Sequence, residues 1–546
     1  MGLITLIIWL IILAITAVVS YFLYISWKYR DYFQKRNVSF LGLGLSRLAR
    51  FFTGKISLID GEYILYKEAK ATGKPFVGMS DLSAPIYFIM DLELLRSIYV
   101  KDFDHFVDRR QFTSEKSDIL ITKMMISLEG EEWKGIRTKL SPTFTTSKIR
   151  KMFSNFELSS NKMCDYIKKR VGSAGGDFDI CEAYSKYAMD VIANCAFGID
   201  SKSFDTEPGA VSTFEDMGNK IQFKFNPRVF AKLMLMMIAP KLADFLGVKP
   251  FDNEPQKYFL KVVKDVMTHR RETGERRDDL LQLMMDAQAG LLKGEDKETM
   301  EVMTGSQEDS TGSSRSVFAP ESEANKKLKF EDIDVAANAV MFLIGGFDTV
   351  QSLLIFSAYS LALHEDIQER LSEEVNSTFK ANGGKLTYDA VHGMNYLDLF
   401  INETLRYYPP AVRTERVCTK DYTIPGSNTV IEKGRAIILP IFGIHRDERY
   451  YENPEKFDPE RFLPENKAKR HPYSFTPFGH GPRNCVGMRF AITEVKAVIA
   501  TLVHNFKLEV GSYTQVPIKF ANAANLKPAE GSGMWLKITP RCEREE

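Results

Sequence analysis

Residues 478–487 hold the most reactive group of side chains in the chain, in the order Phe-Gly-His-Gly-Pro-Arg-Asn-Cys-Val-Gly. Cys485 ends a turn that contains Gly479 and Gly481, and the stretch that begins at Met488 predicts a helix directly after it. Such a turn can direct backbone N–H groups at the sulfur, and a helix N-terminus adds positive potential. Both effects favour a thiolate, which is a strong ligand for iron. A lone cysteine is usually a buried structural residue, but ten consecutive positions of this pattern indicate a ligand.

A second group of reactive side chains lies in the long apolar stretch 330–364. Asp348 and Thr349 follow the glycine pair Gly345 and Gly346 closely there. Paired glycines loosen a helix, and a local widening of its hydrogen-bond ladder is a frequent functional device. Thr349 could then turn its hydroxyl into the opening while Asp348 links it to solvent, which suits proton transfer. The alternative is a packing kink in which Thr349 donates a hydrogen bond to a backbone carbonyl.

An ion pair on a predicted helix is placed to hold the cysteine loop. Glu403 and Arg406 lie three residues apart on one face of a helix that Pro409 must end. An isolated pair of this kind contributes only tenths of a kcal/mol on a surface. Arg461 lies upstream of the cysteine loop in Pro-Glu-Arg-Phe, and it can close a Glu403–Arg406–Arg461 network. We expect this network to fasten the cysteine loop to the helical core.

Trp133 and Arg137 form another pair on one helix face, in Glu-Trp-Lys-Gly-Ile-Arg. A tryptophan N–H beside a guanidinium suits the binding of a carboxylate. The alternative is a helix with one buried and one exposed residue.

Four motifs share one order and spacing: Trp-x-x-x-Arg at 133–137, Glu-x-x-Arg at 403–406, Pro-Glu-Arg-Phe at 459–462 and the loop around Cys485. In these motifs the chain resembles the cytochromes P450, and the resemblance covers nearly everything after residue 50. It looks closest to the microsomal members that metabolise drugs and toxins, particularly those of insects. Residues 29–36 and 410–417 carry that narrower resemblance. The resemblance implies a mainly α fold, with a helix-rich body and small β-sheets, that binds haem b.

The resemblance also implies roles for individual residues. Cys485 would be the proximal thiolate ligand of the haem iron. Positions that hold the haem propionates in related enzymes are matched by Trp133, Arg137, Arg416 and Arg483. Thr349 and Asp348 match the pair that delivers protons to the reacting oxygen, whereas Val350 departs from the usual serine or threonine.

The implied activity is insertion of one oxygen atom from O2 into lipophilic small molecules such as xenobiotics, plant toxins and insecticides. No flavin or nicotinamide motif is visible, so the electrons would come from NADPH-cytochrome P450 reductase, with cytochrome b5 as a second donor. A basic face formed by Lys134, Lys139, Arg489 and Lys496 could dock the acidic reductase. Two alternatives stay open: a biosynthetic P450 with one narrow endogenous lipid or hormone substrate, and a sequestering haem protein without turnover.

Hydrophobic periodicity predicts a body made mostly of helices. The predicted helices are 128–141, 147–171, 180–198, 257–272, 330–364, 365–381, 396–407 and 488–504, and the clearest strands are 85–89 and 436–439. Residues 298–327 are polar and read as a surface loop. Residues 229–251 are apolar but too short and interrupted to span a bilayer, so they form a core helix or an interfacial helix, and the resemblance favours the latter.

The N-terminus predicts a membrane anchor. Residues 1–27 contain no charged side chain and are long enough to cross a hydrocarbon core of roughly 30 Å. Basic residues follow directly, so the positive-inside rule places the rest of the chain in the cytosol. We therefore expect a signal anchor at 1–27, a linker at 28–55 and a haem-thiolate catalytic domain at 56–546, in the endoplasmic reticulum membrane. Trp27, Tyr29 and Tyr32 read as anchors at the membrane interface.

Composition limits the class of protein. The 546 residues include 72 basic and 71 acidic side chains, and the net charge of +1 argues against nucleic acid as the main partner. The six cysteines are irregularly spaced with no Cys-x-x-Cys pair, so they indicate neither a disulfide framework nor a structural zinc site.

Overall fold

The computed structural model describes residues 2–42, 44, 50, 54–80, 84–111, 113, 118–206, 210–221, 227–249, 252–292, 329–523, 525–529 and 531–541. The α-helices are α1 (Gly2–Gln34), α3 (Leu58–Lys70), α4 (Leu92–Arg96), α5 (Ile119–Thr122), α6 (Gly130–Leu140), α7 (Thr146–Val171), α8 (Ile180–Ile192), α9 (Thr213–Ile221), α10 (Pro227–Ile238), α11 (Pro240–Phe245), α12 (Asn253–Thr273), α13 (Leu280–Gln288), α17 (Asp332–Leu363), α18 (Glu365–Ala381), α19 (Tyr388–Gly393), α20 (Asn395–Tyr407), α21 (Ile441–Ile444), α22 (Pro464–Lys467) and α23 (Met488–Asn505). Shorter helical turns are η1 (Ser97–Lys101), η2 (Phe103–His105), η3 (Ser141–Phe144), η4 (Ala193–Phe197), η5 (Pro459–Phe462) and η6 (Pro472–Ser474). The strands are β1 (Phe40–Leu41), β2 (Phe76–Ser80), β3 (Pro85–Ile89), β4 (Gly176–Asp179), β5 (Thr414–Val417), β6 (Tyr422–Thr423), β7 (Val430–Ile431), β8 (Ala436–Leu439), β9 (Phe506–Glu509) and β10 (Trp535–Pro540).

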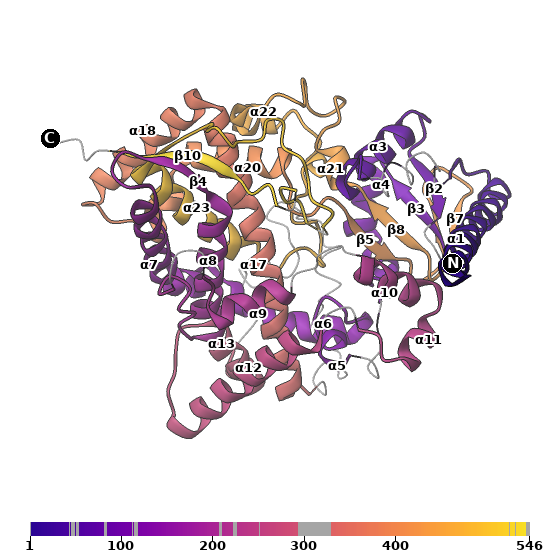
Figure 1. The fold of residues 1–546 in the computed structure, drawn as a ribbon, viewed down its shortest axis with the longest axis horizontal. Helices are drawn as coiled ribbons and strands as arrows, with labels where there is room; N and C mark the ends of the chain where they lie inside the picture. The colour runs from indigo at the N-terminus through magenta and orange to yellow at the C-terminus, as the bar shows by residue number, and fades with distance from the viewer. Residues whose placement is uncertain are drawn as a thin grey trace.

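These elements confirm the prediction of a mainly α fold with small sheets (Figure 1). Each predicted helix is present with ends shifted by a few residues, and the helix expected over 180–198 consists of α8 followed by the π-helical turn η4. Both predicted strands are present as β3 and β8. The polar segment 298–327 lies outside the described residues.

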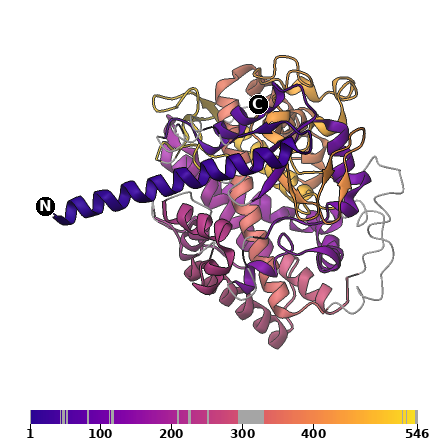
Figure 2. The ribbon, with the colours of Figure 1, turned by 90° about the vertical axis from the view of Figure 1, so that its right-hand side faces the viewer.

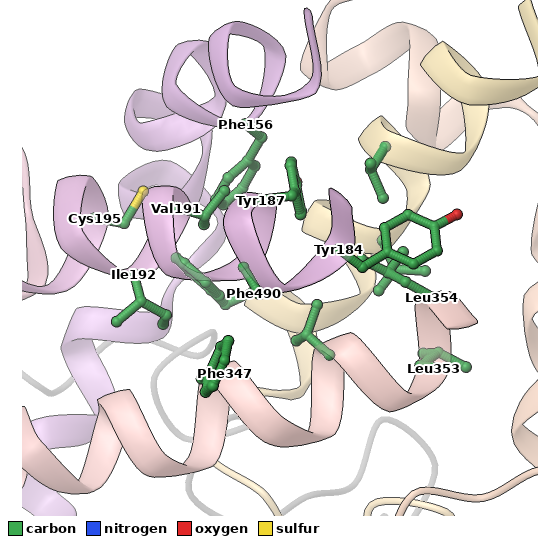
Figure 3. Packing of buried hydrophobic residues seen from close by; sticks show 14 of the residues in the cluster. Phe156, Tyr184, Tyr187, Val191, Ile192, Cys195, Phe347, Leu353, Leu354 and Phe490 are labelled. Carbon is green, nitrogen blue, oxygen red and sulfur yellow. The ribbon is translucent and has the colours of Figure 1, made fainter. Parts of the chain in front are cut away.

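Helix α17 forms the axis of the larger hydrophobic core: α8 and α23 pack against it, and α7 packs against both of these (Figures 1 and 3). It is long and apolar enough to cross a membrane, with a mean hydropathy of 1.8, but 67% of its most apolar window is buried inside the protein. Its burial therefore identifies it as a core helix. A capping box at its start, formed by Glu331 and Asp334, fixes where it begins.

The sheets bring together segments that are far apart in the sequence. The largest has the order β1-β2-β3-β8-β5, in which β3 and β8 are parallel neighbours and β5 pairs antiparallel with β8. Arg416 on β5 lies opposite Ile437 in this register, which places it by backbone hydrogen bonds. The second sheet, β4-β10-β9, and the hairpin β6-β7 complete the strands of the described residues.

The N-terminal helix α1 is continuous through residue 27 and ends only at Gln34, so the first residues of the expected linker are helical. Figure 2 shows its N-terminal end projecting from the body, and the helix contacts β1 and β2 of the large sheet. Tyr29 is only 6% exposed, and the Tyr32 hydroxyl donates to Glu432 at 3.0 Å. The interpretation of these two tyrosines as anchors at a membrane interface is therefore wrong, because they contact the body. Trp27, in contrast, is 69% exposed.

Phe33 fastens α1 to the sheet. Its ring is fully buried, lies 5.3 Å from the ring of Tyr87 on β3, and sits directly against the backbone of Gly78 on β2. A Cβ atom at position 78 would lie 2.3 Å from the Phe33 ring. Only glycine therefore permits this close approach.

We expect Gly78→Ala to lower the free energy of unfolding by about 1–3 kcal/mol, because the added methyl group overpacks the contact with Phe33. In a Phe33→Ala background, which frees that space, the same substitution should cost little. Urea unfolding in detergent of the two single variants and the double variant checks this. An equal cost of Gly78→Ala in both backgrounds would contradict the proposed contact.

Candidate active site

The loop before α23 turns sharply and presents Cys485 to open space. Gly481 has φ = +70°, and a Cβ there would lie 2.0 Å from the backbone oxygen of Tyr99, so this position requires glycine. The backbone N–H of Cys485 donates to the carbonyl of Phe478 at 2.9 Å and closes the turn. Residues 481–484 are buried, whereas Cys485 itself is exposed. The sulfur is therefore presented from a rigid support.

The protein alone does not favour the thiolate at this position. Although the side chain borders open space, desolvation by the surrounding fold raises the pKa of the Cys485 thiol above its ordinary value. The backbone N–H of Gly487 and the positive charges of Arg137 and Arg109 lower it, but they do not outweigh burial. The turn therefore favours the thiolate in the expected direction, through the Gly487 N–H, and coordination to a metal would add the further stabilisation that opposes burial.

Three arginines contact the two residues that precede Cys485, one of which is a fourth arginine, Arg483. Arg137 from α6 donates to the side-chain Oδ1 of Asn484 at 2.6 Å and to its backbone oxygen at 3.1 Å. Arg109 and Arg416 donate to the backbone oxygen of Arg483 at 3.3 Å and 3.5 Å. The predicted residues Arg137, Arg416 and Arg483 are thus brought together around the cysteine loop.

Trp133 joins this group through Arg483. The Arg483 guanidinium lies 4.8 Å from the centre of the Trp133 ring, and it donates to the backbone oxygens of Val107 and Leu128 at 2.6 Å each. Trp133 is 1% exposed, so it packs in the core beneath the arginine. The contacts to two separate backbone segments fix the position of Arg483 relative to α6.

These arginines are destabilised as cations. Burial, together with the charge of Arg109, lowers the pKa of Arg416 to about 9, and burial lowers that of Arg137 to about 10. The pKa of Arg483 is likewise well below its ordinary value, because of burial and then the neighbouring arginines. Within the described part of the chain, the Nε atoms of Arg109, Arg416 and Arg483 are buried without a hydrogen-bond partner. Asp108, 3.8 Å from Arg483, supplies some negative charge, but the cluster keeps an excess of positive charge and three N–H donors without an acceptor among the described residues.

Haem b fits this arrangement. Its two propionates would supply the missing charge and acceptors to the arginines, and Cys485 would supply the ligand to its iron. The described residues include no cluster of three or more His, Cys, Asp or Glu side chains that could bind a metal ion, and Cys485 would hold the haem through its sulfur.

Arg109 is a member of the cluster that the sequence interpretation missed. It follows η2 and is buried deeply enough that its pKa is lowered. Two adjacent arginines, Arg109 and Arg110, were the available signal, but only the fold separates their roles. Arg110 turns away and pairs with Glu415 at 2.6 Å.

We expect Arg416→Met to accelerate haem loss by about 10- to 100-fold, because a hydrogen bond to a charged group contributes about 1.5–3 kcal/mol. Transfer of haem to an excess of apomyoglobin measures the rate. Arg110→Met is the matched control and should leave the rate unchanged. Equal rates in Arg416→Met and the unmodified protein would contradict a role for Arg416 in haem binding.

The residues expected to transfer protons, Asp348 and Thr349, lie on α17, but the helix is not widened there. The Thr349 hydroxyl donates to the backbone oxygen of Gly345 at 2.6 Å, and α17 is a regular α-helix throughout. Gly346 serves close packing, since a Cβ there would lie 2.5 Å from Cδ1 of Ile192. The expectation of a loosened ladder is therefore wrong, and the carbonyl-bonded alternative describes Thr349. Gly345 is nevertheless exposed in the middle of this mostly buried helix, so the face that carries Thr349 borders open space.

Asp348 is buried and points to the C-terminal part of the chain. Its carboxylate accepts a hydrogen bond from Asn525 and forms an ion pair with Lys527. Neither partner was singled out by the sequence.

Aromatic packing connects α17 with the cysteine loop. Phe144 of η3 lies 5.1 Å from Phe342 of α17, ring centre to ring centre, and it is the nearest contact of the position that a Cβ on Gly487 would occupy. Figure 3 shows Phe347 of α17 within the same buried cluster as Phe490 of α23. The two halves of the site are therefore held by one core.

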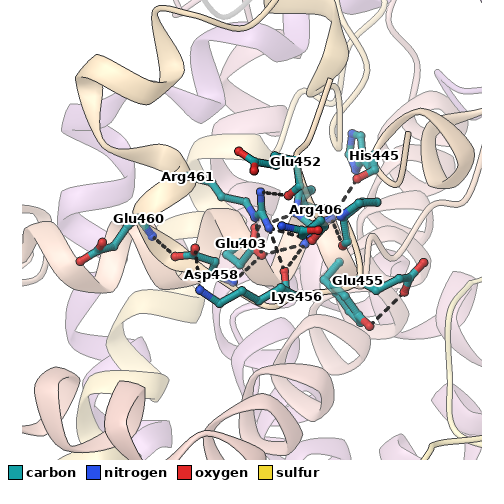
Figure 4. A network of polar contacts seen from close by, with 12 residues as sticks. Glu403, Arg406, His445, Glu452, Glu455, Lys456, Asp458, Glu460 and Arg461 are labelled. Carbon is teal, nitrogen blue, oxygen red and sulfur yellow. Dashed lines mark hydrogen bonds and ion pairs between the residues drawn. The ribbon is translucent and has the colours of Figure 1, made fainter. Parts of the chain in front are cut away.

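The predicted network behind the cysteine loop is present (Figure 4). Arg406 donates from Nε and Nη2 to the two carboxylate oxygens of Glu403, both at 2.7 Å, and both side chains are fully buried. Burial alone would lower the pKa of Arg406, but the contact with Glu403 raises it above its ordinary value. Arg461 lies 3.6 Å from Glu403. The backbone N–H of Asp458 donates to the carboxylate of Glu403 at 2.7 Å. The network thus ties the segment before the cysteine loop to α20.

Comparison with known proteins identifies the family. The sequence model of the cytochrome P450 family matches residues 51–532. Cytochrome P450 9e2 of Blattella germanica is 34% identical over 553 residues, which cover 98% of this chain and 99% of the relative. Cytochrome P450 6a2 of Drosophila melanogaster is 34% identical, over 88% of this chain and 89% of the relative. The probable cytochrome P450 9f2 of the same species is 33% identical, over 94% of this chain and 95% of the relative.

The sequence relationship and the geometry agree. A single presented cysteine, a buried cluster of arginines with unmet charge and the Glu403–Arg406 network all occur where the matched family model extends. The chain therefore belongs to the cytochrome P450 family and is a monooxygenase that binds haem b, with the similar insect enzymes named above among its relatives.

Proposed function

We propose that the enzyme inserts one oxygen atom from O2 into lipophilic small molecules, among them xenobiotics such as plant toxins and insecticides. Cys485, exposed at the end of a buried loop and ringed by arginines, is the observation that carries the proposal. Haem b supplies the oxygen-activating chemistry when bound. The chain would supply the thiolate, the charges that hold the propionates, and a path for protons from α17.

The proton path would consist of Thr349 and Asp348. The Thr349 oxygen retains its acceptor capacity while its hydrogen is donated to Gly345, so it can accept a hydrogen bond from water at the exposed face of α17. To deliver a proton, the hydroxyl would leave the Gly345 carbonyl and turn into the open space. Asp348, one residue earlier, is the acid nearest in sequence that can renew the proton.

We expect Thr349→Ala to preserve the haem content. The ratio of hydrogen peroxide to product should rise roughly 10- to 100-fold, because an apolar side chain cannot pass on the proton. Product and peroxide are measured per NADPH oxidised with reductase present. Val350→Thr, which restores a hydroxyl to the neighbouring buried position, is the comparison variant and should stay coupled. Unchanged coupling in Thr349→Ala would reject the relay.

The proposed location is the endoplasmic reticulum membrane, with α1 as a single span and the catalytic body in the cytosol. Leu6, Trp9 and Leu13 of α1 are 56–66% exposed, as lipid-facing residues would be. Helices α10 and α11, from the apolar segment 229–251, expose Phe245 at 85% and Leu246 at 57%. This supports the interfacial reading of that segment, at which substrates would enter from lipid.

The proposed electron donors are NADPH-cytochrome P450 reductase and cytochrome b5, docked by basic side chains near the cysteine loop. Lys496 does not belong to that surface, because it is 2% exposed and pairs with Asp398 at 2.6 Å. Lys134 is paired with Glu131 at 2.6 Å. Lys139 and Arg489 remain as the partly exposed residues of the expected basic face.

Reconstitution with reductase in lipid vesicles, followed by mass spectrometry on a panel of lipophilic compounds, tests the proposed function. Turnover of several unrelated compounds is the predicted result. A single product from one endogenous lipid or hormone would instead assign a biosynthetic role. Tight binding of compounds without any product would assign a sequestering role.

A further inference from the structure

The carboxylate of Asp348 is held by the segment Asn525 to Lys527, which lies far from it in the sequence. The Asn525 amide donates to Oδ2 of Asp348, and the Lys527 ammonium pairs with Oδ1. The side chains of Asp348 and Lys527 are 13% and 19% exposed. Each carboxylate oxygen thus has its own partner, so the orientation of the acid is fixed.

The same segment is bound to α17 one turn further along. The Ser352 hydroxyl donates to the backbone oxygen of Leu526 at 2.5 Å, and Leu526 is fully buried. On its other side, the backbone N–H of Leu526 donates to Pro410 at 3.0 Å, and Asn525 forms a β-bridge with Ala411. The segment is therefore fastened between α17 and the chain that leads into β5.

The ion pair has consequences for proton transfer because it is largely out of water. A buried carboxylate that loses such a partner is free to rotate. Lys527 would hold Asp348 in one orientation, and its partial exposure places the ammonium between the acid and solvent. Asp348 adjoins Thr349 in the helix, so a change in its orientation acts directly on the proposed proton path.

We infer that Lys527 and Asn525 are positioning residues for the acid of the proton relay, so that the C-terminal segment 525–527 sets how efficiently protons reach Thr349. The inference rests on the proposed relay function of Asp348 and Thr349. It adds a cation and an amide, both from outside α17, as the groups that determine whether Asp348 can take part.

Lys527→Met tests the inference in the full-length enzyme with reductase. The product formed per NADPH should fall roughly tenfold, with the difference appearing as peroxide, while the dissociation constant for substrate from binding spectra stays unchanged. Lys527→Arg, which keeps the positive charge, should restore most of the coupling. Lys519→Met is the matched control, because Lys519 is an exposed lysine in the same part of the chain, and it should behave as the unmodified enzyme.

Hydrogen exchange provides a readout that does not depend on turnover. The N–H of Leu526 is hydrogen-bonded to Pro410, so peptides that contain it should be protected. Lys527→Met and Asp348→Asn should each accelerate exchange there by about tenfold, and Lys519→Met should not. If Lys527→Met forms as much product per NADPH as the unmodified enzyme, the inference is overturned, whether or not hydrogen exchange is faster. If Asp348→Asn also stays coupled, the relay itself fails; if Asp348→Asn uncouples and Lys527→Met does not, only the positioning role fails.

Discussion

Replacing Cys485 by serine is expected to lower product formation by about 10³-fold or more, since the residue that binds the iron is lost. Serine preserves the small polar shape, and the supports of the loop do not involve the sulfur: Gly481 contacts Tyr99 and Arg137 holds Asn484. The folded protein should therefore remain, with haem bound less tightly. Product formation with reductase and haem content per chain are the measurements.

A second cysteine provides the control for this substitution. Cys181, at the start of α8, is partly buried, and its backbone N–H donates to Oδ1 of Asp179. No contact between Cys181 and the cysteine loop occurs among the described residues. Cys181→Ser should retain turnover within about twofold, as for a change outside a functional site. Retention of a tenth or more of the activity in Cys485→Ser would contradict the assignment of the ligand.

The largest expected effect on folding comes from Glu403→Gln. This change leaves the guanidinium of Arg406 fully buried without its negative partner, and breaking a buried pair in this way costs about 3–5 kcal/mol. Arg406 also holds the backbone oxygens of His445 and Pro454 at 3.0 Å and 2.9 Å, so the segment before the cysteine loop should loosen with it. Denaturant unfolding followed by tryptophan fluorescence and haem absorption checks both effects.

An exposed pair offers a matched control for this variant. Arg370 and Glu460 meet at 2.7 Å, but their side chains are 52% and 53% exposed. Glu460→Gln should therefore cost less than about 1 kcal/mol. If both variants lose the same stability, burial of the Glu403–Arg406 pair does not have the importance assigned to it.

Much of the fold follows from local sequence. The helix ends are marked by side chains and prolines: Pro409 follows α20, and the turn before Met488 fixes the start of α23. The end of α1 was not predictable in this way. Residues 28–34 are helical because Phe33 fits against Gly78 and Tyr32 reaches Glu432, and both contacts join parts of the chain that the sequence does not place together.

The site shows the same division between local and distant information. Cys485, Trp133 and Arg137 stand in local motifs, and the structure places them together with Arg416 and Arg483. The burial and the partners of these residues could not be predicted from the neighbouring sequence. The raised pKa of the Cys485 thiol results from burial by several elements, and the clamp on Asp348 comes from Lys527, far along the chain.

The absorption spectrum of the reduced, carbon monoxide-bound protein tests the central assignment most directly. Thiolate ligation by Cys485 predicts a strongly red-shifted Soret band in the purified full-length chain, which disappears in Cys485→Ser. A band at the position typical of haem bound through nitrogen, or the same red-shifted band in Cys485→Ser, would contradict the account.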